Sequence, residues 1–192
     1  MISRRVLFAL IASATISLDP LPRSAHATTV VPVTIETLAR RADEVLIVTP
    51  RHATSAWFGR VIDTDYDLEV QTVVRGASVA GAHVTLRAPG GVVGSIGQQI
   101  PGVPALEINR PYVVFLSRAS DVPGVFYLTH LTAAVLPVTA ASDGTLTALP
   151  AAEGMRVRTG IVVPNALATE ATAMAREGMT LDALVREIRS AH

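Results

Sequence analysis

The stretch Val61–Val74, VIDTDYDLEVQTVV, decides the fold of this chain. Its even positions carry Ile, Thr, Tyr, Leu, Val, Thr and Val, whereas the odd positions from 63 to 71 carry three Asp, one Glu and one Gln. Successive side chains of a β-strand point to opposite faces of the sheet. The alternation therefore predicts one long strand with a buried face and a polar face.

Further strands are expected on both sides of this stretch. Val45–Thr49 and Tyr112–Leu116 are apolar at every or nearly every position, which is typical of strands that are covered on both faces. His83–Ala88 again alternates, and the dipeptide at 143–144, Asp-Gly, is a hairpin signal. The remaining expected strands are Val125–Leu131, Ala134–Thr139 and Thr145–Leu149.

Helices are expected before and after these strands. Thr34 can cap a short helix over residues 35–42, residues 165–176 are alanine-rich, and Thr180 can cap a last helix. That last helix carries an amphipathic stripe, expected to pack on the sheet: Leu181, Leu184, Val185 and Ile188. Short strands with flanking helices predict a mainly β fold, a small antiparallel OB-like barrel or sandwich.

The segment Pro89–Pro104, PGGVVGSIGQQIPGVP, has five glycines and three prolines and nearly lacks charge. Glycine reaches conformations that other residues avoid and proline fixes φ, so we expect a shaped loop rather than a helix or a ladder. Long shaped loops between rigid elements are usually functional. The residues expected to contact a ligand, through backbone amides and two side-chain amides, are Gly90, Gly91, Gly94, Gly97, Gln98 and Gln99.

The first residues have the pattern of an export signal. Arg4 and Arg5 precede the uncharged apolar run Val6–Leu18, and Ala25-His26-Ala27 is a small-x-small cleavage signal. We expect cleavage after Ala27, a secreted or periplasmic protein, and no membrane span in the mature chain, because the apolar run is shorter than the roughly 20 residues of a spanning helix. The expected organisation is a signal peptide at 1–27, an OB-like β domain at 28–150 and a helical appendage at 151–192.

Composition excludes several chemistries. The chain has no cysteine, so it can form no disulfide, thiolate metal site or cysteine nucleophile. All 16 basic residues are arginine, which excludes Schiff-base and P-loop lysine chemistry. The formal net charge is zero, so nucleic-acid binding has no electrostatic support. We expect no cofactor and no metal.

The acidic side chains of the long strand have two interpretations. They form either an exposed acidic face, paired across strands with His83 and Arg87, or an ion site. Neighbouring residues on one face of a strand lie roughly 6.5–7 Å apart, too far to surround one ion without help, which favours the first interpretation. These side chains are Asp63, Asp65, Asp67 and Glu69. A hydrolase site would have to be assembled from Asp63, Asp65, His83 or His130.

Five segments together carry a resemblance. They are ADEVLIV at 42–48, YDLEVQTVVRG at 66–76, VTL at 84–86, Gly90-Gly91-x-x-Gly94, and the apolar strand 112–116. This pattern, spanning about residues 42–131, resembles an uncharacterised group of exported bacterial proteins and is similar to the netrin-like OB barrel of the tissue inhibitors of metalloproteinases. The resemblance implies a barrel fold. In those inhibitors an N-terminal cysteine chelates the zinc of the target; this chain has no cysteine, so their inhibitory residues do not carry over.

The function expected from the sequence is an exported, non-enzymatic binding module. It would recognise an exported protein or peptide through the segment Pro89–Pro104, and its sharpest form is an inhibitor of a protease. The alternatives are an envelope structural protein without a specific ligand and, third, a hydrolase. Trp57-Phe58, an adjacent aromatic pair, would be either packed at a hairpin edge or an exposed anchor.

Overall fold

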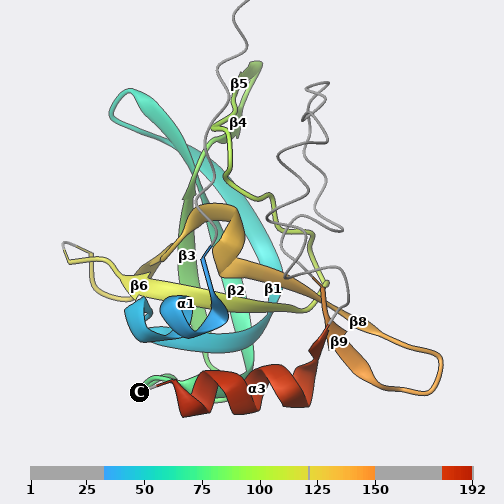
Figure 1. Ribbon diagram of the computed structural model, residues 1–192. Helices are drawn as coiled ribbons and strands as arrows, with labels where there is room; N and C mark the ends of the chain where they lie inside the picture. Colours follow the sequence, from blue (N-terminus) through green and yellow to red (C-terminus); the bar gives the residue numbers. More distant parts are fainter. Residues whose placement is uncertain (1–32, 121, 150–178, 192) are drawn as a thin grey trace, which may run out of the picture. The chain divides into compact units, whose positions relative to one another are not determined.

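The computed structural model describes residues 33–120, 122–149 and 179–191, which form a mainly β fold with a helix near each end (Figure 1). The predicted fold class is confirmed. In chain order the elements are α1 (Ile35–Arg41), β1 (Glu44–Phe58), β2 (Val61–Arg75), β3 (His83–Pro89), β4 (Gly91–Val93), β5 (Ile96–Gln98), β6 (Tyr112–Arg118), β7 (Val125–Leu128), the 3-10 helix η1 (Leu131–Ala134), β8 (Val135–Ala140), β9 (Leu146–Ala148), β10 (Met179–Thr180) and α3 (Leu181–Ser190).

Five strands close into a ring. β1 pairs with β2, β2 with β3, β3 with β7, β7 with β6, and β6 pairs back onto β1. Only the β3–β7 pair is parallel, and the other four are antiparallel. A five-stranded ring of this kind is the architecture of a small OB-like barrel. β8, β9 and β10 continue the sheet outward from β6.

The alternation of Val61–Val74 is confirmed in β2. Even positions such as Ile62 and Leu68 are fully buried, whereas the odd positions from 63 to 69 are only half-buried. β1 is longer than expected, because residues 52–58 belong to it. Its first part, up to Val48, pairs with both β2 and β6, and a register shift between Pro50 and His52 separates this part from a second part that pairs only with β2. Such a bulge bends a strand, and here it accompanies the departure of β1 from β6.

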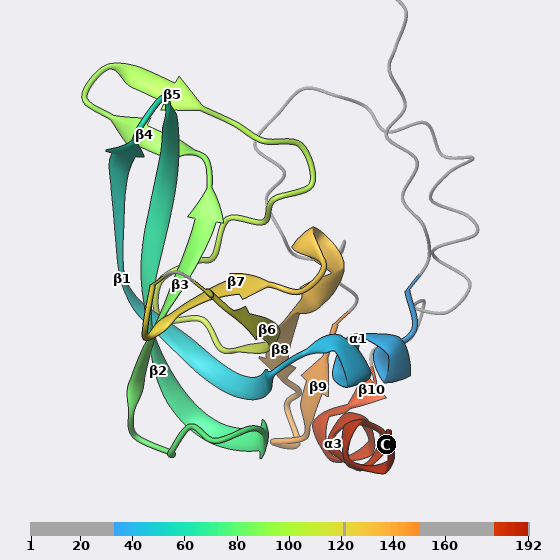
Figure 2. The same cartoon turned by 90° about the vertical axis from the view of Figure 1, so that its left-hand side faces the viewer.

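Two groups of buried side chains hold the fold together. One lies inside the ring and includes Leu68, Leu86 and Val114. The other joins the ring to both helices and includes Phe115 and Leu184. Figure 2 shows α1 and α3 side by side near β9 and β10, while the β1–β2 hairpin and the β4–β5 hairpin reach the opposite end.

Both predicted helix caps are confirmed. Thr34 Oγ1 accepts from the Thr37 N–H at 3.1 Å, and Thr180 Oγ1 accepts from the Ala183 N–H at 3.4 Å. The stripe of α3 packs into the core as expected, since Leu181, Leu184 and Ile188 are buried. In the described part of the chain, no helix is both long and apolar enough to cross a membrane. The expected signal peptide and the expected helix at 165–176 lie outside the described residues.

One predicted strand was too long. β7 ends at Leu128, and Leu131 begins η1 with a φ of 32° instead of continuing a strand to position 131. The chain after β7 is hydrogen-bonded to a different segment: the Thr132 N–H donates to Gly102 O at 2.9 Å. This bond ties the chain after β7 to the Pro89–Pro104 segment and turns it out of the sheet.

Candidate binding surface at the end of the β1–β2 hairpin

Part of the Pro89–Pro104 segment forms a hairpin, so the expectation of a loop without a ladder is wrong here. β4 and β5 pair antiparallel, with Val93 opposite Ile96 and Gly94-Ser95 as the two-residue connection. Gly94 has a φ of 60° and Ser95 has no positive φ, which matches a type II′ turn with glycine first. A Gly-Ser dipeptide between two short runs is a hairpin signal in its own right, and it was hidden by the density of glycine and proline around it.

The hairpin is fixed onto β2 by three hydrogen bonds. The Gly90 N–H donates to Ile62 O at 2.7 Å, and the Ile62 N–H donates to Gln98 Oε1 at 2.6 Å. Thr64 Oγ1 donates to Gly90 O at 2.7 Å. Two of the residues expected to contact a ligand, Gly90 and Gln98, therefore bind the protein's own second strand through these groups.

Gly91 is also needed for packing. A Cβ at this position would lie 2.4 Å from both Ser55 Oγ and Thr64 Oγ1, two hydroxyls that are bonded to each other at 2.8 Å. Its φ of 145° adds strain for any residue with a side chain. β4 can therefore cross this face of the β1–β2 hairpin only with glycine at 91. The other three expected contact residues, Gly94, Gly97 and Gln99, are exposed.

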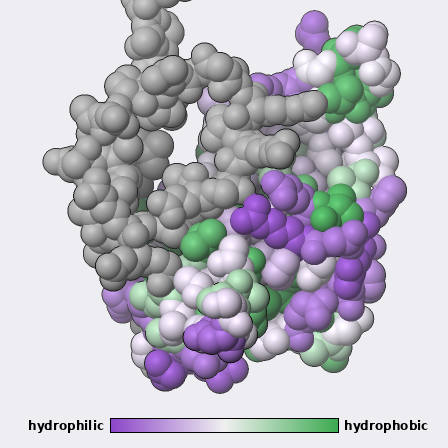
Figure 3. Space-filling model, turned by 90° about the vertical axis from the view of Figure 1, so that its right-hand side faces the viewer, coloured by the Kyte–Doolittle hydropathy of each residue, from purple (hydrophilic) through white to green (hydrophobic). Residues whose placement is uncertain are grey.

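Exposed apolar side chains gather at the same end of the molecule. Figure 3 shows hydrophobic atoms at the upper right of the view, toward the end of the molecule that both hairpins reach in Figure 2. We call four of these residues the apolar tip. Their exposed fractions are 47% for Trp57, 45% for Val61, 56% for Val92 and 54% for Ile96. Sequence reasoning singled out Trp57 alone, because Val92 and Ile96 stand in the glycine-rich segment.

Phe58 and its cross-strand partner Val61 project to the opposite face of the hairpin from Trp57, and Phe58 is partly covered. The Arg87 guanidinium stacks over its ring at 3.9 Å from the centroid, and that guanidinium also donates to both carboxylate oxygens of Asp65 at 2.7 Å. The aromatic pair 57–58 is thus divided: Trp57 is exposed, and Phe58 is part of a stacked ion pair.

The acidic residues of β2 pair across strands, as predicted. Besides the Asp65–Arg87 pair, His83 Nδ1 lies 2.7 Å from Asp67 Oδ1, and the Arg51 Nε–H donates to Glu69 Oε2 at 2.6 Å. This bond from Arg51 holds the pKa of Glu69 below its usual range.

Asp63 differs from its three acidic neighbours on β2. Burial raises its pKa, an effect that the charge of Arg87 opposes and that of Asp65 reinforces. Among the described residues, no group of three His, Cys, Asp or Glu side chains is placed to hold a metal ion. Asp65 and His83 bond to different partners, so they do not form an acid–base pair.

A buried carboxylate that sequence reasoning missed holds the other end of the barrel. Glu44 is fully buried, and its oxygens accept from the Ala77 N–H at 3.1 Å, the Ser78 N–H at 3.2 Å and Arg118 Nη2 at 2.5 Å. It joins the ADEV and VVRG segments, two of those that carry the resemblance. In this structure, Glu44 of the first segment holds the β2–β3 turn that follows the second segment.

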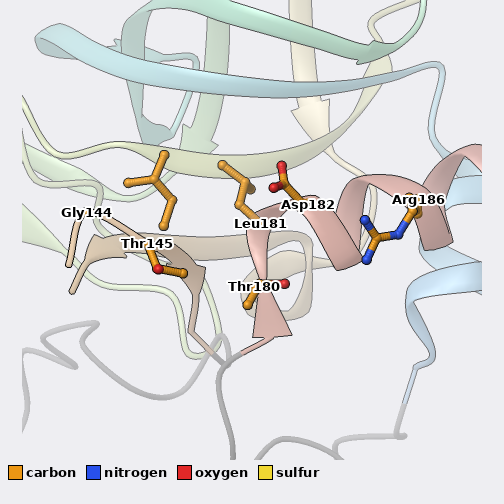
Figure 4. A pocket seen from close by; sticks show the side chains of 7 residues that line it. Gly144, Thr145, Thr180, Leu181, Asp182 and Arg186 are labelled. Carbon is orange, nitrogen blue, oxygen red and sulfur yellow. The ribbon is translucent and has the colours of Figure 1, made fainter.

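Two hollows lie elsewhere on the described part of the chain. The larger, about 410 Å³, lies beside the start of α3, where Figure 4 shows Thr145, Thr180, Asp182 and Arg186 along its wall. Thr180 Oγ1 already accepts the capping bond of α3 from the Ala183 N–H. The smaller, about 130 Å³, is apolar and lies between β3, β7 and Leu131.

Comparison of the chain with protein-family models, curated proteins and solved structures gave no match. The resemblance to the exported bacterial group and to the netrin-like barrel therefore stays a prediction.

Proposed function

We propose that this protein is an exported, non-enzymatic binding module that recognises a protein or peptide through the apolar tip. The observation that carries the proposal is the exposure of Trp57, Val61, Val92 and Ile96 at the end of the molecule that both hairpins reach. Large exposed apolar patches on soluble proteins often mark sites of interaction with a partner. Aromatic anchors such as Trp57 often supply much of the binding energy of such surfaces.

The role of the glycine-rich segment in this proposal is to place side chains. Gly90, Gly91 and Gln98 fix β4–β5 onto β2, and the hairpin then presents Val92 and Ile96 to solvent. Recognition is thus mainly apolar, in place of the backbone-amide recognition expected from the sequence. In the inhibitor form of the proposal, the partner is an exported protease.

The test is capture from the native exported fraction with the chain as processed on export. Ile96→Asp puts a charge on the tip, and Val79→Asp is its control, because Val79 is 69% exposed beyond the opposite end of β2. We expect a protein that wild type and the Val79 variant capture and the Ile96 variant does not, with unchanged circular dichroism for all three. Equal capture by both variants would refute the role of the tip.

A further inference from the structure

We propose that the partner is held by strand addition: an extended segment of it pairs with the free edge of β1 at residues 53–57. This inference rests on the proposed function and names how the bound protein is engaged. In strand addition, main-chain hydrogen bonds supply affinity and alternate side chains supply specificity. A further strand can pair only with backbone groups of β1 that point away from β2, and the hydrogen bonds of the neighbouring strand show which groups these are.

Ile62 fixes that direction. Its N–H donates to Gln98 Oε1 and its C=O accepts from the Gly90 N–H, so both groups point away from β1. In an antiparallel pair, residues whose backbone groups point away from each other form a non-hydrogen-bonded pair. The residue opposite Ile62 is Trp57. The N–H and C=O of Trp57 therefore point away from β2.

The same alternation holds along the hairpin. The register runs without a shift from Ala53 opposite Tyr66 to Phe58 opposite Val61, so Ser55 and Ala53 also direct their N–H and C=O away from β2. Pro89 agrees with this alternation. It lies on β3 opposite Asp63 of β2, at a position where a backbone N–H would point away from β2, and proline has no N–H to pair there.

Nothing in the described part of the chain pairs with these groups. β6 pairs with β1 only as far as Val48, and β4 pairs with β5 alone. β4 crosses the face of the hairpin at Ser55 and Thr64, and no backbone hydrogen bond joins it to Ala53, Ser55 or Trp57 in the described residues. The edge thus offers the backbone groups of Ala53, Ser55 and Trp57 to a further strand.

This edge also lacks the usual protection against pairing. Natural edge strands carry charges, prolines or bulges that block further strands. Residues 52–58, HATSAWF, contain no Asp, Glu, Lys, Arg or Pro, and the bulge of β1 lies before them. An edge without this protection, next to the apolar tip, favours pairing of β1 with a strand of another protein.

The charged residues on either side of the edge indicate which side chains the bound segment would carry. Before the edge, Arg51 is already paired with Glu69 at 2.6 Å and with Asn109 at 2.8 Å. After it, the exposed Arg60 has no ion pair within the described residues. This pattern fits an extended segment that has no charge where it lies along residues 53–57 of β1. The segment would carry an apolar side chain toward Trp57 and a carboxylate near Arg60.

The test uses the chain as processed on export and a phage library of random linear peptides. Ala53→Pro removes one outward N–H, at an exposed edge position that tolerates proline. Thr54→Pro, one residue along, removes an N–H that pairs with β2, so its Tm should fall while that of Ala53→Pro stays near wild type. Selected peptides should bind Ala53→Pro about tenfold more weakly than wild type, the effect of one lost hydrogen bond. They should bind Val79→Ser unchanged.

A second measurement covers the case in which Ala53→Pro does not fold. A bound peptide should slow amide hydrogen exchange at Ala53, Ser55 and Trp57 of the wild-type chain. The inference is overturned if no peptide is selected, if peptides bind Ala53→Pro as tightly as wild type, or if these amides become protected only as the chain itself self-associates. A native partner that is lost by Ile96→Asp and retained by Ala53→Pro would leave the proposed function standing and remove strand addition.

Discussion

The carboxylate of Glu44 lies in the space that a side chain at position 76 would need. A Cβ on Gly76 would be 2.0 Å from Glu44 Oε2, and the φ of Gly76 is 124°, a conformation that suits glycine. The same carboxylate accepts the N–H groups of the two following residues and pairs with Arg118. The start of β1 and the β2–β3 turn are thereby fixed to each other.

Gly76→Ala should therefore lower the free energy of unfolding by about 3 kcal/mol, since it combines backbone strain with displacement of a buried charge. Gly81→Ala is the matched control: its φ is 82°, but a Cβ there would meet nothing within 4 Å. It should cost only about 1 kcal/mol of strain. Urea titration measures both, and equal losses would show that Glu44 moves aside freely.

The β4–β5 hairpin offers a second matched pair. Gly91→Ala should cost about 3 kcal/mol, because its Cβ would collide with Ser55 Oγ and Thr64 Oγ1 and its φ is unfavourable. Gly97→Ala should cost less than about 1 kcal/mol, because its Cβ would make an ordinary contact of 3.7 Å with Val92 Cγ2. Thermal unfolding compares them; a tolerant Gly91 would argue against the close crossing of β4 over β1 and β2.

The raised pKa of Asp63 predicts that the stability of the folded state depends on pH. Its pKa is raised by burial, so its charged form is disfavoured in the folded state. Between the ordinary pKa and the raised one, the folded state binds more protons than the unfolded state, and this group's contribution to stability falls as pH rises. Asp63→Asn should therefore be more stable than wild type at pH 7, with the difference vanishing below the ordinary pKa of aspartate. Denaturant titration across pH measures it, and a less stable variant at pH 7 would contradict the stated cause.

The last helix should be part of the same cooperative core. Leu184 is 1% exposed and belongs to the cluster that joins α1, α3 and the barrel. Leu184→Ala should cost about 3 kcal/mol, whereas Arg186→Ala, on the exposed face of α3, should cost less than about 0.5 kcal/mol. Calorimetry should show one transition for both variants. An unchanged Tm for Leu184→Ala would mean that α3 does not pack as described.

Local pattern predicted much of this fold. The alternation of Val61–Val74 gave the long half-buried strand, and Thr34 and Thr180 marked both helix starts. That the acidic strand pairs with His83 and Arg87 followed from polar positions on neighbouring strands. These features depend on residues close in sequence or on simple period-2 registry. The parallel pairing of β3 with β7 had no such signal, because it is set by closure of the ring.

The candidate site was predicted only in part. The segment Pro89–Pro104 was singled out correctly as unusual, but its glycines were interpreted as ligand contacts, whereas Gly90 and Gly91 serve close packing onto β1 and β2. Collisions of this kind depend on segments far apart in sequence. The open edge of β1 could not be predicted either, since the direction of its N–H groups is revealed only by the bonds of Ile62 on the neighbouring strand.

The most direct test of the central claim, an open strand edge beside the apolar tip, is amide hydrogen exchange of residues 53–57 in the free chain as processed on export. The account predicts a period of two: Ala53, Ser55 and Trp57 exchange fast, while Thr54 and Ala56 are protected by their bonds to β2. Protection of all five amides would contradict it, because the edge would then be covered before any partner arrives.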